Sequence, residues 1–474
     1  MELDKDLAAR QEARALCRQA GVAAQKLRQM TQAHLDTITA AMAEAFAQAA
    51  GELAELAVRE TGFGNAKDKS TKNTFASRTV LEAIRDLQCV GVLTEDPQRK
   101  LWKIGVPVGV IAAIVPSTNP TSTVCYKALI ALKSGNAIVF SPHPKALNCT
   151  LRAARIVAEA AEKAGAPKGS ICCLESGSMT GTQELMSAPE VKLILATGGP
   201  GMVRAAYSSG KPAIGVGAGN GPAYIHPSAD MGRALDRILQ SKDFDHGTVC
   251  ASEQSIIVEK GSEEALLRLA KDKGFYFMST AEADALGKLL FKPGGGLSPD
   301  VVGKAADHLA KLAGFSVPAG TRILVARADK VGPKYPYSME KLCPVLALFV
   351  VADEDASLQK ALEVLSHEGS GHTFCIHAES TDVIRRFALE MPVSRFLVNT
   401  PAALGGIGYS TGLFPALTLG CGAVGGSSTS NNVSPMDLVN IRMVAWDTEK
   451  HPPETTVDAT LIDLLTAKIL ERLK

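Results

Sequence analysis

The chain has 474 residues, with 50 basic and 49 acidic side chains and a formal net charge of +1. This length predicts about three domains, or two large domains with an appendage. The balanced charge, without a basic block, argues against a nucleic-acid partner. No apolar stretch of about 20 residues lacks charges, and the charged N-terminus has no apolar signal core, so neither a membrane span nor a leader is predicted. The expected location is the cytoplasm.

Ten cysteines are spread along the chain. Apart from the adjacent Cys172 and Cys173 they show no paired spacing, which favours reduced thiols over a disulfide framework. His367, His372 and His377 recur at five-residue steps. This step suits neither one helical face nor one strand face, so no metal site is predicted there.

The first half of the chain begins with helices. Ala-rich helical periodicity covers residues 7–48, a second helix ends at Thr61-Gly62, and after a polar stretch at residues 64–73 a third helix runs to about residue 86. Short apolar runs then alternate with helices of about 10 to 15 residues. This alternation is typical of crossover units in a parallel sheet that helices cover on both faces. Residues 1–223 are therefore predicted to form a nucleotide-binding domain.

A Gly- and Pro-rich stretch at residues 211–227 is predicted to be a hinge or an active-site loop. It contains G-x-G-x-G, but the pattern lacks the preceding strand and following helix that a dinucleotide fingerprint requires. A second alternation of strands and helices predicts a second α/β domain, the catalytic one, over residues 224–414. Within and beyond it, residues 402–433 form a long Gly/Ser/Thr-rich segment of the kind that commonly lines sites.

Two strand-like segments look like appendages. One lies at residues 97–106 and the other in the return segment at residues 415–450, and each carries one Trp and several charges. They are predicted either to pair as an oligomerisation arm that packs on another subunit or to be two edge strands.

The C-terminal tail, residues 451–474, is predicted to be a polar linker followed by an amphipathic helix from residue 458. Such a helix either docks on a partner or folds back on its own domain, and the sequence leaves both alternatives open. Its apolar face carries Ile462, Leu465, Ile469 and Leu473.

A candidate nucleophile lies in the stretch from Asp245 to Val258. Here Cys250 stands in a Gly/Thr/Ser-rich turn just ahead of a β-branched run. A strand that leaves such a turn holds its first residues rigidly, which suits a covalent catalyst. The alternative is that Cys250 is a small buried hydrophobe, as free cysteines commonly are. Its polar surroundings differ from the apolar runs that hold most of the other cysteines, but local chemistry alone leaves both interpretations open.

Seven motifs add a more specific signal. Over about residues 30–445 the chain contains VPSTNPTS, FSPHP, ATGGPGMV, GVGAGNGP, FDHGTVCASEQSIIV, EKLCPVLA and LTLGCGAVGGSSTSNNV, in that order. This series resembles the CoA-acylating branch of the aldehyde dehydrogenase superfamily, as found in bifunctional aldehyde-alcohol dehydrogenases and in bacterial microcompartments. The resemblance implies two doubly wound α/β domains, one nucleotide-binding and one catalytic, with a small oligomerisation hairpin.

The resemblance also implies roles for single residues. Cys250 matches the family's nucleophile, and Asn119 matches the asparagine whose amide, with the Cys250 backbone N–H, holds the developing oxyanion. Taken alone, Asn119 is better explained as an Asn-Pro turn. No carboxylate stands where the adenine ribose would lie, so NAD is expected and NADP is left open. The positions that match the family's cofactor site are Pro116, Ser141, Pro142, His143, Thr197, Gly198 and Glu340.

The informative departure from the family pattern is Val216. Hydrolytic members carry a Glu at this position, which activates the water that releases the acid. An apolar residue there leaves the thioester to the thiol of CoA, a better nucleophile than water. The sequence therefore predicts an enzyme that converts a short-chain aldehyde, NAD and CoA to acyl-CoA and NADH, in either direction.

Three alternatives are left. One is a hydrolytic dehydrogenase of the same fold, another is a glutamyl-phosphate-reductase-like enzyme that uses phosphate, and the third is a non-catalytic assembly component that docks through its C-terminal helix. A homodimer or a dimer of dimers is expected. Because residues 458–474 resemble peptides that target enzymes to microcompartment shells, a shell contact inside a microcompartment is also predicted. The aldehyde itself is not specified, and His372 is predicted to contact substrate or CoA or to be a buried structural residue.

Overall fold

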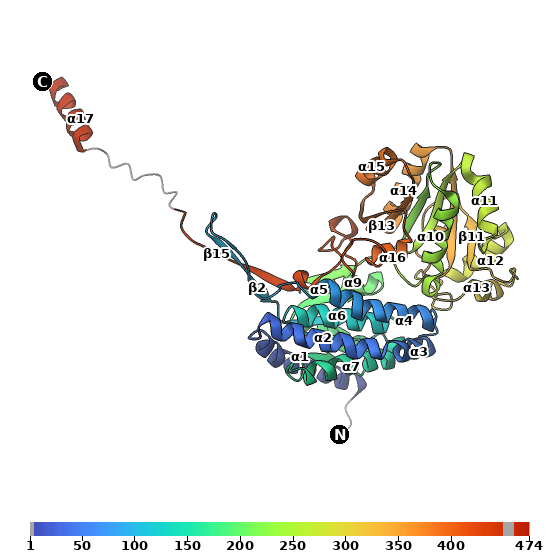
Figure 1. Cartoon of the computed structure of the whole chain (residues 1–474), viewed down its shortest axis with the longest axis horizontal. Helices are drawn as coiled ribbons and strands as arrows, with labels where there is room; N and C mark the ends of the chain where they lie inside the picture. Colours follow the sequence, from blue (N-terminus) through green and yellow to red (C-terminus); the bar gives the residue numbers. More distant parts are fainter. Residues whose placement is uncertain (1–3, 449–458, 474) are drawn as a thin grey trace.

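A computed structural model describes residues 4–448 and 459–473 of the chain. Three sheets of five, seven and three strands organise these residues. Figure 1 shows the five-stranded sheet with the N-terminal helices in one body, the seven-stranded sheet in a second body, and the three-stranded sheet as an arm that projects from the first. The two larger sheets are parallel and are covered by helices, which confirms the predicted fold of two doubly wound α/β domains.

Helices precede the first sheet. They are α1 (Lys5–Leu27), α2 (Gln32–Gln48), α3 (Ala50–Thr61), α4 (Ala66–Thr74) and α5 (Val80–Ile84), with a π-helical turn (Phe75–Thr79) between the last two. As predicted, α3 ends at Gly62, whose left-handed φ of 70° closes the helix. The polar stretch at residues 64–73 is mostly helix α4 instead of a connection. Asn65 caps this helix by accepting from the Asp68 N–H, and Lys69, Lys72 and Asn73 lie on its buried side.

The five-stranded sheet has the order β5-β4-β3-β6-β7. Its strands are β3 (Val110–Ile114), β4 (Ala137–Ser141), β5 (Ile171–Cys173), β6 (Val191–Thr197) and β7 (Ala213–Val216), connected by α6 (Pro120–Lys133), α7 (Leu147–Lys163), α8 (Met179–Ser187) and α9 (Pro200–Tyr207). All of these strands run parallel, so their carboxyl ends share one edge. The motifs VPSTNP, FSPHP and ATGG stand at the ends of β3, β4 and β6 and therefore meet at that edge.

The seven-stranded sheet has the order β10-β11-β12-β9-β8-β13-β14. Its strands are β8 (Gly221–Ile225), β9 (Glu253–Glu259), β10 (Phe275–Phe277), β11 (Ile323–Arg327), β12 (Val345–Val351), β13 (Gly371–His377) and β14 (Val393–Val398). The helices of this domain are α10 (Met231–Asp243), α11 (Glu263–Lys271), α12 (Thr280–Leu290), α13 (Ala306–Leu312), α14 (Glu354–His367) and α15 (Thr381–Glu390). The segment after α16 (Ala402–Gly406) returns to the first domain, where Leu419 and Val433 join the core.

The prediction of a loop at residues 211–227 is wrong for most of that stretch, because it contains β7 and β8. Both strands are short and rich in Gly or Pro, which removes the β-branched signal by which strands are identified in a sequence. β7 closes the first sheet and β8 lies in the second, so the predicted domain boundary at residue 223 falls inside β8. No helix follows β7, and the G-x-G-x-G there crosses between the two sheets.

The two predicted appendage strands pair with each other. β2 (Leu101–Pro107) and β15 (Val439–Ala445) are antiparallel neighbours, and Trp102 meets Trp446 edge to face at a centroid distance of 4.9 Å. A further strand, β1 (Gly91–Asp96), completes the arm on the other side of β2. The pairing confirms that these distant segments form one unit.

The predicted C-terminal helix is α17 (Ala459–Arg472), and the linker before it lies outside the described residues. The side chains of its apolar face are all exposed, so the structure does not show the helix folded back on its own domain. Within residues 4–448 and 459–473, none of the helices has the length and apolarity that crossing a bilayer requires.

Candidate active site

A cavity of about 470 Å³ lies between the two α/β domains, at the carboxyl edge of the five-stranded sheet. It brings together seven predicted site residues from five segments that are far apart in the sequence. Two predicted residues do not line it: Ser141 and Pro142 are buried at the end of β4, where Ser141 Oγ and Thr182 Oγ1 share a hydrogen bond of 2.7 Å. The predicted residues on the cavity wall are Pro116, Asn119, His143, Thr197, Gly198, Cys250 and Glu340, together with Val216.

Cys250 lies in the turn that leads into β9 and faces the cavity. Most of the other cysteines are buried, whereas Cys250 is half-buried. The crossing loop between β7 and β8 packs directly on this turn, because a Cβ added to Gly219 would lie 1.8 Å from the Cys250 carbonyl oxygen. The backbone around the thiol is thus tightly enclosed while the residue borders the cavity, which favours the nucleophile over the buried hydrophobe.

The charge state of Cys250 follows from its surroundings. Burial raises the pKa of the thiol to about 12, with Glu340 and Cys421 acting in the same direction and Arg395 opposing them. The protein's own groups therefore keep the thiol protonated at neutral pH. A positive charge placed beside it in the cavity would favour the reactive thiolate.

Glu340 lines the same cavity. Its Oε1 accepts a hydrogen bond of 2.9 Å from the Gly219 N–H, and its backbone N–H donates to the Glu368 carboxylate at 2.6 Å. Burial raises the pKa of Glu340 to about 8, and the nearby charge of Glu368 adds to this effect. Glu340 is thus a carboxyl group that is mostly protonated at neutral pH and can donate a hydrogen bond into the cavity.

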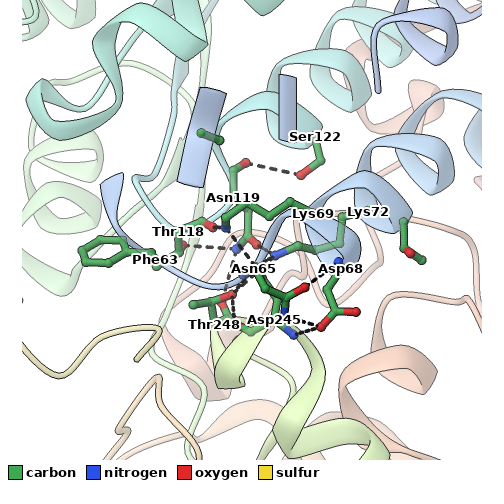
Figure 2. A network of polar contacts seen from close by, with 12 residues as sticks. Phe63, Asn65, Asp68, Lys69, Lys72, Thr118, Asn119, Ser122, Asp245 and Thr248 are labelled. Atoms are coloured by element: carbon green, nitrogen blue, oxygen red, sulfur yellow. Dashed lines mark hydrogen bonds and ion pairs between the residues drawn. The ribbon is translucent and has the colours of Figure 1, made fainter. Parts of the chain in front are cut away.

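Asn119 stands at the start of α6, but its side chain does not cap that helix. Figure 2 shows it engaged across the domain boundary instead. The Lys72 ammonium donates to Asn119 Oδ1, while Asn119 Nδ2 donates to the Thr248 carbonyl at 3.3 Å and to Thr118 Oγ1 at 3.1 Å. The explanation of Asn119 as a simple turn residue therefore accounts for its backbone only.

Below Asn119 lies a buried ionic group that the sequence analysis missed. Asp245 accepts from Lys72 Nζ, from Lys69 Nζ at 2.9 Å and from Thr248 Oγ1 at 2.7 Å. Burial acts to raise the pKa of Asp245, but the charges of Lys72 and Lys69 outweigh it and hold that pKa below its ordinary value. Burial lowers the pKa of Lys72 to about 8, although Asp245 acts to raise it. The one available signal was the spacing of Lys69 and Lys72, which places both on one helical face.

Comparison with known proteins agrees with this geometry. Residues 4–274 match the aldehyde dehydrogenase family. The chain belongs to this family.

Individual relatives show which members of the family this aldehyde dehydrogenase is similar to. The chain is 46% identical over 420 residues to the bifunctional aldehyde-alcohol dehydrogenase AdhE of Escherichia coli, covering 88% of this chain and 47% of that protein. It thus spans about half the length of the aldehyde-alcohol dehydrogenases that it matches.

Two solved structures cover nearly the whole chain. An acetylating aldehyde dehydrogenase from Geobacillus thermoglucosidasius is 46% identical, with a TM-score of 0.93, over 96% of this chain and 100% of that one. A propionaldehyde dehydrogenase from Rhodopseudomonas palustris, with bound CoA and an acylated cysteine, is 27% identical, with a TM-score of 0.84, over 92% and 97%. The predicted resemblance to the acylating branch is confirmed.

The aldehyde dehydrogenase cavity also contains groups that suit a dinucleotide. Thr197 Oγ1 is buried without a hydrogen-bond partner among the described residues, and α9 begins beside it with no side-chain cap. A Cβ added to Gly199 would meet nothing within 4 Å. An unpaired hydroxyl, a helix start without a side-chain cap and an open glycine loop fit the phosphates and sugar of a nicotinamide cofactor.

His372 does not lie on the wall of the cavity, where a residue that contacts substrate is expected. It is buried in β13, where its Nδ1 shares a hydrogen bond of 2.9 Å with Thr373 Oγ1, and it is not among the residues that line the cavity. Burial, reinforced by Arg395, holds its pKa well below the usual range, so the ring is neutral. These observations favour the buried structural residue.

Proposed function

We propose that this aldehyde dehydrogenase converts a short-chain aldehyde, NAD and CoA to acyl-CoA and NADH, reversibly, through a thioester on Cys250. One observation carries the proposal: the half-buried Cys250 lines a cavity in which Val216, 4% exposed, provides no base to activate water. The acetylating and CoA-bound relatives support the same chemistry.

In the proposed reaction the Cys250 thiolate attacks the aldehyde carbon and forms a thiohemiacetal. Asn119 Nδ2 and the Cys250 backbone N–H hold the oxyanion that develops, and removal of one such donor typically costs about 2.7–4 kcal/mol of barrier. When bound, oxidised nicotinamide supplies the hydride acceptor and a positive charge that favours the thiolate. Pro116, His143, Thr197, Gly198 and Glu340 are proposed to line its site, with Ser141 and Pro142 behind them.

The thioester is proposed to pass to CoA because its two competing nucleophiles differ. Water needs a positioned base to attack a thioester at a useful rate, whereas a thiol is partly ionised near neutral pH and is intrinsically more nucleophilic. Val216 offers the cavity two methyl groups in place of a carboxylate. The exchange of one thioester for another is nearly isoenergetic, so this step also allows the reverse reduction of acyl-CoA.

The test is NADH formation with acetaldehyde, run with CoA, with phosphate and with neither, and repeated with NADP. The expected result is rapid turnover with NAD and CoA only. Turnover without an acceptor would identify a hydrolytic enzyme, and turnover that requires phosphate would identify an acyl-phosphate-forming one. No turnover with any of several short-chain aldehydes would favour a non-catalytic assembly component.

The arm formed by β1, β2 and β15 is proposed to pack on a second copy of the chain, in a homodimer or a dimer of dimers. β1 and β15 are the two edge strands of this sheet, and the arm exposes Val92, Ile441 and Met443, each at least 44% accessible. Unpaired strand edges with apolar side chains are surfaces that proteins commonly cover. Replacing Ile441 and Met443 by Asp should lower the mass measured by light scattering, and an unchanged mass would contradict the assignment.

The exposed helix α17 is proposed to dock on a microcompartment shell. Its apolar face, which includes Ile462, Leu465 and Ile469, has no cover in the structure. Deletion of residues 451–474 should leave turnover intact and abolish co-sedimentation with shells. Loss of folding on deletion would instead show that the helix stabilises the enzyme.

A further inference from the structure

Helix α4 presents two buried lysines to the domain boundary. Lys69 and Lys72 are each 2% exposed, and both donate to the same oxygen, Asp245 Oδ2. Their second contacts differ. Lys69 donates to the Thr118 carbonyl at 2.8 Å, whereas Lys72 donates to the Asn119 side chain (Figure 2). The two lysines are thus equally buried and share one counter-ion, but of the two only Lys72 contacts the side-chain amide of Asn119.

The contact of Lys72 with Asn119 decides how that amide is oriented. A lysine ammonium is a donor only, so the atom that faces it must be the acceptor Oδ1. The amide nitrogen is then the donor end of the group, and it donates to Thr118 Oγ1 and to the Thr248 carbonyl. Thr248 lies two residues before Cys250, so Nδ2 is directed toward the turn that carries the thiol. With the opposite orientation, an oxygen would face the developing negative charge and oppose it.

Asp245 holds Lys72 in place from the other domain. Asp245 and His246 have positive φ angles of 48° and 51°, an uncommon conformation for residues other than glycine. The surrounding contacts fix this turn, since the Asp245 carboxylate accepts from both lysines, from Thr248 Oγ1 and from the Asn65 N–H at 2.9 Å. The ion pair therefore links α4 of the first domain to the turn just ahead of Cys250 in the second.

We propose that Lys72 is the positioning residue of the oxyanion site: anchored on Asp245, it orients the Asn119 amide so that Nδ2 faces the oxygen of the thiohemiacetal. This inference rests on the proposed function, because it concerns the intermediate formed on Cys250. Lys72 acts through Asn119, and its effect should therefore disappear when Asn119 is absent.

The test is a double-mutant cycle of Lys72→Met and Asn119→Ala, measured as kcat and KM with acetaldehyde, NAD and CoA. Removal of an oxyanion donor typically lowers kcat by about 10²–10³-fold. We expect Asn119→Ala to show this loss, Lys72→Met to lose about tenfold or more in kcat with little change in KM, and the double variant to match Asn119→Ala within about threefold. Multiplicative losses in the double variant would overturn the proposal.

Lys69→Met is the matched control. It removes an equally buried lysine from Asp245 but leaves the Asn119 contact, so its kcat should stay within about threefold of the parent while its thermal stability falls as in Lys72→Met. Equal losses of kcat in both lysine variants would show a purely structural role and overturn the assignment. Lys72→Met is expected to fold, because Asp245 keeps Lys69, Thr248 and Asn65 as partners.

Alkylation of Cys250 by iodoacetamide provides a second measurement that involves no oxyanion. Its rate should be unchanged in Lys72→Met, because the displacement needs the thiol but not the Asn119 amide. A parallel fall in alkylation and turnover would show that Lys72 supports the thiol turn instead and would overturn the positioning role.

If Lys72→Met fails to fold, Lys72→Gln, which keeps an N–H donor, must retain more kcat than Lys72→Ala. Absence of turnover in the parent enzyme would reject the proposed function, whereas a Lys72→Met variant with parental kcat would reject only the positioning role.

Discussion

Two carboxyl groups near Cys250 differ in their charge because their neighbours differ. Asp245 is buried and Glu340 is half-buried on the cavity wall, and loss of solvent alone would raise the pKa of each. Asp245 receives two ammonium groups and its pKa falls below the ordinary value, whereas Glu340 has a single backbone donor, lies near Glu368, and has a pKa of about 8. Burial therefore decides the charge of Glu340, whereas at Asp245 the two ammonium groups outweigh it.

Because their charges differ, Asp245 and Glu340 have different roles in the site. Asp245 is a permanent charge that fixes Lys72 and, through it, the Asn119 amide. Glu340 is a titratable group on the cavity wall, and it changes its charge in the pH range where the enzyme is expected to operate. A rigid charge suits the support of a catalytic group, and a neutral carboxyl suits a hydrogen bond to a ligand hydroxyl.

The largest effect is expected from Asp245→Ala. This change leaves Lys69 and Lys72 buried without their common counter-ion, and breaking a buried pair in this way typically costs about 3–5 kcal/mol. Urea denaturation should show a loss of that size, whereas Glu340→Ala should lower the unfolding free energy by no more than about 1 kcal/mol, because it leaves no buried charge without its counter-ion. Equal losses of unfolding free energy in the two variants would contradict the proposed difference between Asp245, which is always charged, and Glu340, which titrates.

A carboxyl group introduced at Val216 tests whether a base in the cavity would activate water. Val216→Glu puts a carboxylate where water would have to be activated, and a positioned general base typically contributes about 10²–10⁴-fold. NADH formation without CoA should therefore rise at least about tenfold, as measured by absorbance with acetaldehyde and NAD. Val216→Gln, of the same shape but without a base, should show no rise. If both variants behave alike, the apolar side chain of Val216 is not what protects the thioester from water.

The smallest effect is expected from Glu340→Gln, which mimics the protonated carboxyl. The folded-state pKa of about 8 lies above the ordinary value of 4.5, so the folded protein binds more protons than the unfolded chain between these values. The contribution of Glu340 to stability must therefore fall as the pH rises from 4.5 to about 8. Glu340→Gln should flatten this fall in denaturation curves recorded across the range. An unchanged slope would mean that Glu340 is ionised throughout.

Much of the fold was predictable because its signals are local. Alternating apolar runs and helices indicated the parallel sheets, and the polar turn before a β-branched run singled out Cys250. Strands β7 and β8 were missed because their Gly and Pro residues hide the usual strand composition. The arm was predictable as a pair only because its two Trp-bearing segments were unlike the rest of the chain.

The ionic support of the site was not predictable, because its partners are distant in sequence. Lys72 and Asp245 are separated by 173 residues, and the lysines stand in a stretch whose composition is typical of a solvated connection. Only the folded structure brings this stretch under Asn119 as the buried face of α4. Motif resemblance identified residues that line the cavity, whereas the residues that hold them in place carried no comparable signal.

One measurement decides whether Cys250 carries the acyl group to CoA. The enzyme is incubated with NAD and acetaldehyde without CoA, and its intact mass and peptides are recorded before and after CoA is added. A single acetyl group on Cys250 that persists without CoA, disappears as acetyl-CoA forms, and is absent from Cys250→Ala is the predicted result. Free acetate formed at the same rate with and without CoA, or turnover in Cys250→Ala at the parental rate, would contradict it.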